Sequence, residues 1–119
     1  MPLLVAAGAA VGAPARYFTD RYVQSRHDSV FPWGTLTVNA VGCLILGALV
    51  GAGTDAAMVA LVGTGFCGAL TTYSTFGFET HRLIQDRSYL VAGANVAASL
   101  VVGLGAASLG FVVGGWLAP

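Results

Sequence analysis

The chain has 119 residues, of which 8% are charged and 56% are hydrophobic. About one-quarter of the residues of a soluble domain are charged, so this composition predicts an integral membrane protein. Five basic residues, all arginine, are balanced by five acidic ones, and nothing in this charge indicates a nucleic-acid partner. No basic region precedes Leu3, so a cleaved signal peptide is not expected.

Four apolar segments reach or approach the length of about 20 residues that crosses the hydrocarbon core of a bilayer. They cover residues 2–18, 33–52, 56–78 and 88–117. The first is short and includes Arg16 near its end, whereas the last exceeds one crossing and is expected to tilt or protrude. The sequence therefore predicts one all-α domain of four transmembrane helices.

The connecting segments predict a one-sided distribution of positive charge. Polar loops at 19–32 and 79–87 fall on the same side after these crossings and hold every arginine except Arg16, which borders that side. The tight turn at 53–55 and both termini fall on the other side, which has no basic residue. By the positive-inside rule, the arginine loops face the cytoplasm and the termini face outward.

Pairs of glycines four residues apart predict close packing of helix backbones. These pairs are Gly8/Gly12, Gly47/Gly51 and Gly110/Gly114. Because four thin helices rarely enclose a pathway unaided, an oligomer is expected.

The third span combines apolar character with poor helix formers at its centre. Gly63, Gly65 and Gly68 precede five consecutive hydroxyl side chains, from Thr71 to Thr75. The glycines match a dinucleotide-binding pattern, but the strand and helix that this pattern requires are missing. The stretch instead predicts close backbone approach or a break in the third helix. A broken helix survives at membrane depth where it is buried in protein or lines a wet cavity, and its free carbonyls can bind sodium.

Two interpretations stay open for the side chains that follow. Tyr73 and Phe76 share a helical face, where they either contact lipid and core or turn their positive ring edges toward an anion. The hydroxyls of Thr72, Ser74 and Thr75 either donate hydrogen bonds to an anion or bond back to carbonyls four residues earlier.

Asn39 in the second span, and Asn95 and Ser99 in the fourth, are also open to two interpretations. They form interhelical hydrogen bonds, worth about 0.6 kcal/mol each, or they supply a track of N–H and O–H donors to an anion. No acidic residue, lysine or histidine lies inside a predicted span, so proton relays and charged carriers lack their usual groups. No nucleophile–base pair or metal-ligand cluster appears, and an enzyme is not expected.

The residues closely resemble the signature of the CrcB/Fluc fluoride channels. The segment Gly65-Phe-Cys-Gly-Ala-Leu-Thr-Thr-Tyr-Ser-Thr-Phe76 carries the resemblance, supported by Gly12-x-x-x-Arg16-Tyr17 and Gly34-Thr-Leu-Thr-Val-Asn39-x-x-Gly42. The resemblance covers essentially the whole chain. It implies passive fluoride efflux across the plasma (inner) membrane, which protects the cell from fluoride. It also implies an antiparallel dimer of oppositely oriented subunits, with two pores along their interface and a structural sodium ion at its centre.

The resemblance assigns roles by position. The backbone carbonyls of Gly68 and Thr71 would hold the sodium ion, and Arg16 matches the family's structural first-span arginine. The ion pathway would be lined by Asn39, Tyr73, Ser74, Thr75, Phe76, Asn95 and Ser99.

Three features depart from the family pattern. Tyr73 replaces the usual first phenylalanine. In the fourth span, the family has a polar track of Tyr, Ser and Ser, whereas this chain has Asn95, Ser99 and Gly103 at those positions. The second difference leaves open whether both pores conduct. The one-sided arginines suit a subunit of fixed orientation. The hypothesis is therefore a heterodimer with a paired homologue, and a homodimer is the alternative.

Two rival functions belong to other classes. Small multidrug exporters are also four-span proteins that form antiparallel dimers, but they depend on a glutamate in the first span, and none occurs between Pro2 and Phe18. A non-conducting assembly subunit would use the glycine-rich helices only to bind partners, and it would not need the run of hydroxyls.

Overall fold

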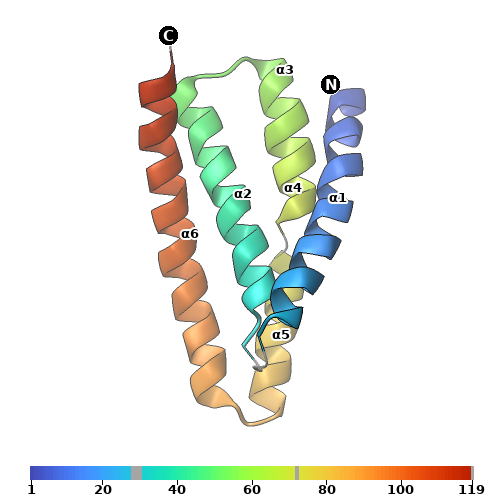
Figure 1. The fold of residues 1–119 in the computed structure, drawn as a ribbon, viewed down its shortest axis with the longest axis vertical. Helices are drawn as coiled ribbons and strands as arrows, with labels where there is room; N and C mark the ends of the chain where they lie inside the picture. The colour runs from blue at the N-terminus through green and yellow to red at the C-terminus, as the bar shows by residue number, and fades with distance from the viewer. Residues whose placement is uncertain (28–30, 72, 119) are drawn as a thin grey trace.

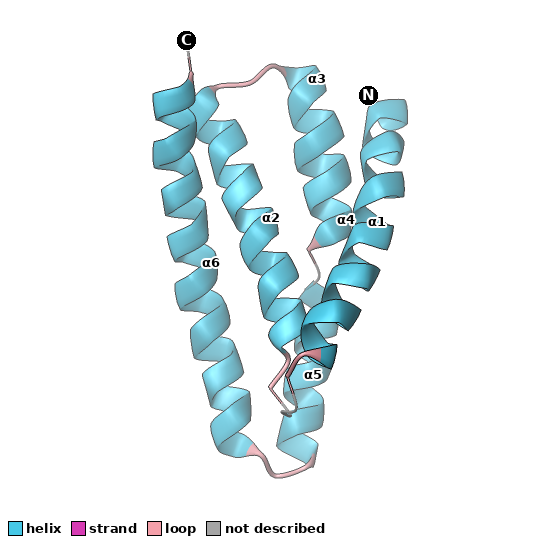
Figure 2. Ribbon diagram, viewed as in Figure 1, coloured by secondary structure: helices cyan, strands magenta, loops and turns pink. Residues whose placement is uncertain are grey.

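The computed structural model describes residues 1–27, 31–71 and 73–118, leaving aside the side chains of Tyr73 and Ser74. Every regular element in these ranges is a helix (Figure 2), so the all-α prediction is confirmed. The helices are α1 (Pro2–Ser25), α2 (Trp33–Ala52), α3 (Ala56–Met58), the π-helix η1 (Val59–Cys67), α4 (Gly68–Leu70), α5 (Tyr73–Gln85) and α6 (Tyr89–Leu117). Both chain ends lie near the α2–α3 connection, and the α5–α6 turn lies at the opposite end (Figure 1).

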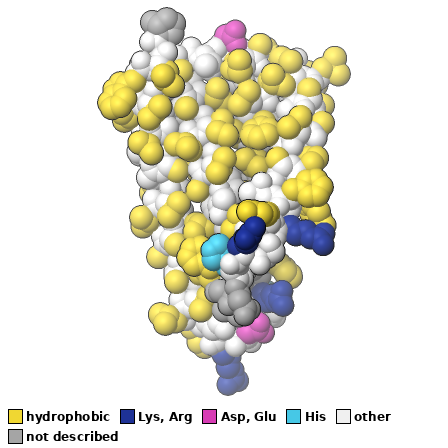
Figure 3. All heavy atoms as spheres, viewed as in Figure 1, with side chains coloured by type: hydrophobic (Ala, Val, Ile, Leu, Met, Phe, Trp, Pro, Cys, Tyr) yellow, Lys and Arg dark blue, Asp and Glu magenta, His cyan; other side chains and the backbone are white. Residues whose placement is uncertain are grey.

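Three helical stretches of the described chain are long and apolar enough to cross a membrane. They are Trp33–Ala52, Ala56–Gln85 and Tyr89–Leu117. Their apolar side chains largely face outward: only 6% of the apolar window of α6 is buried, and hydrophobic atoms cover much of the face seen in Figure 3. These features indicate a multi-pass membrane protein. Helix α1 is not among the three stretches, so the fourth crossing stays a prediction.

Two of the predicted polar loops are partly helical. Helix α1 continues to Ser25 and α5 continues to Gln85, although loops were expected from residues 19 and 79. Those loop predictions were wrong because hydropathy marks where a helix leaves an apolar layer, whereas backbone hydrogen bonds decide where it ends. The turn at 53–55 is confirmed. Gly53 ends α2 in the left-handed region at φ 65°, and the Asp55 carboxylate accepts a hydrogen bond from the Met58 amide at 2.8 Å.

The paired glycines lie where helix backbones approach most closely. Gly47 and Gly51 of α2 leave no room for a Cβ, because backbone carbonyls of α6 occupy that space. Gly110 and Gly114 of α6 meet backbone atoms of α2 in the same way, and the pair in α1 meets η1. The predicted glycine contacts are therefore confirmed. They join α2 to α6 and α1 to η1, the two helix pairs visible in Figure 1.

The third predicted span is the irregular part of the fold. Its first half is the π-helix η1, which contains Gly63 and Gly65. Such i→i+5 segments are rare and occur frequently at functional sites. Helix α4 then ends at Leu70, the backbone of Thr71 is extended at φ −78° and ψ 156°, and α5 begins at Tyr73. Residue 72 lies outside the described residues, so a complete helix break here stays a prediction.

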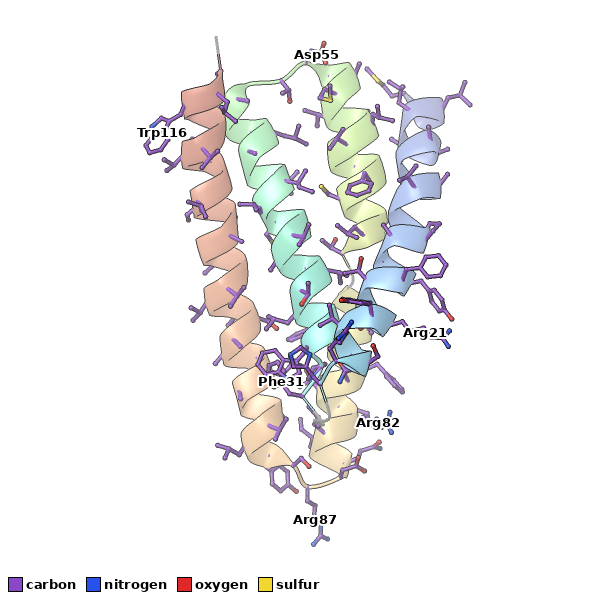
Figure 4. The ribbon with its side chains drawn as sticks, in the orientation of Figure 1. Arg21, Phe31, Asp55, Arg82, Arg87 and Trp116 are labelled. Atoms are coloured by element: carbon purple, nitrogen blue, oxygen red, sulfur yellow. The ribbon has the colours of Figure 1, made fainter. Side chains whose placement is uncertain are left out.

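Charged side chains gather toward one end of the molecule. Arg21, Arg82 and Arg87 lie toward the α5–α6 turn, whereas Asp55 lies at the opposite end, where both termini also lie (Figure 4). The fold thus keeps the arginines together, as the predicted loop arrangement required. Which end faces the cytoplasm stays a prediction.

Candidate functional site

A cavity of about 400 Å³ lies between α2, the irregular third segment, α5 and α6. Residues that are far apart in the sequence meet there, because α2 and α6 pack closely through their glycines while η1 and α4 run past α2. Five of the predicted site residues line this cavity: Asn39, Gly68, Thr71, Phe76 and Ser99.

The remaining wall of the cavity is apolar or small. Leucines from α2 and α6 contribute to it, together with the free thiols of Cys43 and Cys67. Gly103, which stands where the family has a serine, also lines the cavity. Among the described residues of this wall, none is charged. The cavity can therefore offer an amide, a hydroxyl and an aromatic ring to a small anion without a fixed positive charge.

Gly42 brings α2 close to the end of α4. A Cβ at this position would overlap the methyl group of Thr71, so a larger residue would force the Thr71 side chain to move.

Thr71 uses its side chain within its own helix. Its hydroxyl donates to the Cys67 carbonyl at 2.8 Å, and its amide donates to the same carbonyl at 2.9 Å. Two interpretations are open for the neighbouring hydroxyls, and Thr71 follows one of them, the hydrogen bond back to a carbonyl four residues earlier. Its own carbonyl follows an extended backbone and lies outside a regular helix.

The backbone around Gly68 is uncrowded. Gly68 is exposed, and a Cβ placed there would lie 4.0 Å from the Gly63 carbonyl oxygen, an ordinary contact distance. No group of three or more His, Cys, Asp or Glu side chains comes together within the described ranges. A metal ion in this region would therefore depend on backbone carbonyls, which are hard oxygen ligands.

Arg16 and Thr75 lie together in a smaller pocket of about 120 Å³ beside the second half of α1. Tyr17, Asp20 and Thr35 also line this pocket. Burial raises the pKa of the Asp20 carboxyl, beyond the predicted first span, and the neighbouring Arg16 guanidinium acts in the opposite direction. Arg16 thus lies beside a half-buried carboxyl group, away from the main cavity.

Asn95 does not line the main cavity. Its side chain is only 1% exposed, and its amide donates to the Thr80 hydroxyl at 2.9 Å. The predicted roles of Tyr73 and Ser74 concern side chains that lie outside the described part of the structure.

The hydrogen bond between Thr35 and Glu79, outside the main cavity, was not expected. Thr35 is 2% exposed, and its hydroxyl donates to the Glu79 carboxylate. Glu79 reaches α2 because α5 continues where the sequence predicted a loop. The spacing of three residues between Phe76 and Glu79, which places them on one side of a helix, was the signal that could have found it.

The comparisons with known proteins agree with the motif resemblance. Residues 3–111 match a family described as CrcB-like protein, Camphor Resistance (CrcB). The chain is 57% identical over 117 residues to fluoride-specific ion channel FluC 1 of Frankia casuarinae, covering 91% of each chain. It is 57% identical over 112 residues to FluC 1 of Streptomyces avermitilis, covering 91% of this chain and 90% of that one. It is 53% identical over 109 residues to FluC 2 of Rhodococcus jostii, covering 92% of this chain and 94% of the other.

Proposed function

This chain belongs to the CrcB family, and we propose that it is a fluoride-specific ion channel, not an enzyme, through which fluoride leaves the cell passively. One observation of the fold supports this most directly. Asn39, Phe76 and Ser99, from three different helices, line one cavity whose described wall has no charged residue. The relatives named as fluoride-specific ion channels share about half or more of its residues over nearly its whole length.

The chemistry of the cavity suits a small, strongly hydrated anion. Fluoride gives up water only where hydrogen-bond donors replace it, and the Asn39 amide and the Ser99 hydroxyl are such donors. The edge of the Phe76 ring carries partial positive charge and can face the anion. Binding must also be weak enough for the ion to leave, and a wall without fixed positive charge meets that need. We extend the pathway from this cavity to Tyr73, Ser74 and Thr75 by family resemblance.

We infer that a second, inverted subunit completes the pathway. Leu100 lines the cavity yet is 60% exposed, and most of the apolar surface of α6 has no partner within the described chain. A copy packed against this face would close the cavity and give two pores along an antiparallel interface. The one-sided distribution of the arginines supports a heterodimer with a paired homologue, and a homodimer is the alternative.

We further propose a structural sodium ion held between the subunits by the backbone carbonyls of Gly68 and Thr71. The uncrowded backbone at Gly68 and the extended backbone at Thr71 support this assignment. Two carbonyls are too few to coordinate sodium, so the second subunit would supply the remaining ligands. A bound sodium ion would add positive potential beside the anion pathway.

A growth experiment tests the function in cells. The chain is expressed in the plasma (inner) membrane of a bacterial host that lacks its own fluoride channel, alone and together with a paired homologue. We expect growth in fluoride that the empty host cannot tolerate, because efflux lowers the cytoplasmic fluoride concentration. If the protein is present in the membrane in both arrangements and protects in neither, the proposal fails in favour of a non-conducting assembly subunit. Resistance to cationic drugs without resistance to fluoride would favour the multidrug exporter.

A further inference from the structure

The two buried polar side chains among the described residues both bind α5. Thr35 of α2 is 2% exposed and donates its hydroxyl hydrogen to the Glu79 carboxylate. Asn95 of α6 is 1% exposed and donates an amide hydrogen to the Thr80 hydroxyl at 2.9 Å. Two different helices therefore hold consecutive residues of α5. We call these two hydrogen bonds, Thr35–Glu79 and Asn95–Thr80, the α5 clamp.

The clamp continues to Phe76 through Thr80. The Thr80 hydroxyl donates to the Phe76 carbonyl at 2.9 Å. A hydroxyl has only one hydrogen to donate, so toward Asn95 it must act as an acceptor. Asn95 must accordingly present its NH₂ group, which fixes the orientation of the amide. The hydrogen bonds run in one direction, from Asn95 to Thr80 to Phe76.

Helix α5 needs such contacts because it is short and begins beside an irregular segment. It has 13 residues and starts at Tyr73, directly after the extended Thr71 and residue 72. An isolated helix of this length is marginal in water, so tertiary contacts help to hold α5 in place. The rotation of α5 and its position along the helix axis, relative to the cavity, therefore depend on side-chain contacts. The clamp lies one turn beyond Phe76.

We propose that the α5 clamp sets the position in which the Phe76 ring faces the cavity. Asn95 is then a positioning residue that acts through Thr80, and it is not a ligand of the anion. This inference rests on the proposed function only in taking Phe76 as a residue of the fluoride pathway. The carboxylate of Glu79 serves as the acceptor that fixes α5 to α2.

The experiment follows the Phe76 ring directly. The full-length, assembled protein carries 4-fluorophenylalanine at position 76 and is observed by ¹⁹F NMR, while fluoride efflux is measured per assembled channel. Asn95→Leu and Thr80→Val remove the donor and the acceptor of one hydrogen bond, and Thr80→Ser keeps the hydroxyl. Thr37→Val is the control for Thr35→Val, because the Thr37 hydroxyl donates at 2.8 Å to the carbonyl of Trp33 in its own helix.

We expect the resonance to shift or broaden in Asn95→Leu, Thr80→Val and Thr35→Val, and to stay unchanged in Thr80→Ser and Thr37→Val. Efflux through the first three variants should fall about three- to tenfold, the range that interhelical hydrogen bonds of this kind would produce. The Asn95→Leu, Thr80→Val double variant should match Thr80→Val alone, because both changes break the same bond.

Several results would overturn the inference. An unchanged resonance in assembled Asn95→Leu and Thr80→Val would show that the clamp does not set the ring position. Reduced efflux of Asn95→Leu with an unchanged resonance would make Asn95 an anion ligand. If Asn95→Leu does not assemble, Asn95→Asp replaces it. Its carboxylate lacks the amide donor and should draw the Thr80 hydrogen away from Phe76, so an unchanged resonance there also contradicts the clamp. A shifted resonance in a protein that conducts no fluoride would instead refute the proposed function and leave the clamp standing.

Discussion

Phe76 contributes an aromatic ring to a cavity whose described wall has no charged group. The edge of this ring carries partial positive charge and can contact an anion. Phe76 comes from α5, whereas the amide of Asn39 and the hydroxyl of Ser99 come from α2 and α6. Each side chain contributes a different kind of partial positive charge, and none provides a strong binding site alone. Loss of the ring should therefore interrupt the pathway while leaving the fold intact.

Phe76→Ile tests this role. We expect fluoride efflux to fall to the level of protein-free vesicles, because isoleucine fills much of the space but has no ring edge. The change should cost less than about 1.5 kcal/mol of stability, since one apolar side chain replaces another. Phe78→Ile is the matched control, because Phe78 is two residues away on α5 and 65% exposed. Unchanged efflux from assembled Phe76→Ile would remove Phe76 from the pathway.

Gly103→Ser restores the serine that the family has at this position of the fourth span, and it tests whether that hydroxyl contributes to anion binding. A Cβ at Gly103 would lie 3.8 Å from the Cys43 sulfur, an ordinary contact, so the structure has room for the serine. We expect assembly to be unchanged and the fluoride concentration at half-maximal efflux to fall, because the cavity gains an O–H donor. A higher half-maximal concentration would show that this part of the cavity does not bind the anion.

The motifs of the sequence predicted part of the set of residues that meet at the cavity, but not how Asn95 is used. The family resemblance groups Asn39, Phe76 and Ser99, which lie in three different segments of the chain, and all three line one cavity. Asn95 pairs with Thr80 only because α5 continues past the point where the hydropathy falls. Such a partner depends on helix length and on the register between helices, which the spacing along one chain does not contain.

At the level of the helices, glycine contacts decide how closely α2 and α6 pack. Glycine spacing was sufficient to predict these contacts, since only a residue without a Cβ permits a carbonyl to lie against it. The π-helix η1 could not be predicted in the same way. Its i→i+5 hydrogen-bond pattern is rare, and no local composition rule specifies it.

Gly110→Ala and Gly105→Ala make the same change at two places on α6. A Cβ at Gly110 would overlap the Leu44 carbonyl, so Gly110→Ala should force the helices apart and cost about 1–3 kcal/mol. A Cβ at Gly105 meets nothing within 4 Å, so Gly105→Ala should be neutral, or stabilising by up to about 1 kcal/mol through helix propensity. Thermal unfolding in detergent measures both changes. Equal effects would contradict the glycine packing between α2 and α6.

Over the whole molecule, the arginines gather at one end and the outward face of α6 is apolar. Arg21, Arg82 and Arg87 gather toward the α5–α6 turn, and the apolar side chains of α6 face outward (Figures 3 and 4). The first feature favours a single orientation in the membrane. The second requires either lipid or a second subunit to cover the cavity.

The orientation of the chain expressed alone tests the heterodimer hypothesis. Tags on the termini are mapped for access from each side of the membrane. We expect the termini outside in nearly all molecules, because the positive-inside rule keeps the arginine end in the cytoplasm. An even mixture of orientations would indicate a homodimer of inverted copies and would contradict a fixed orientation.

Fluoride efflux from liposomes that contain the purified protein, together with its paired homologue where assembly requires one, tests the central claim most directly. A fluoride electrode outside the vesicles records release down the fluoride gradient, and a chloride electrode records the competing ion. The account predicts rapid fluoride release that needs no proton gradient, little chloride release, and loss of release in Phe76→Ile. Assembled protein that releases no fluoride, or releases chloride equally well, would contradict it.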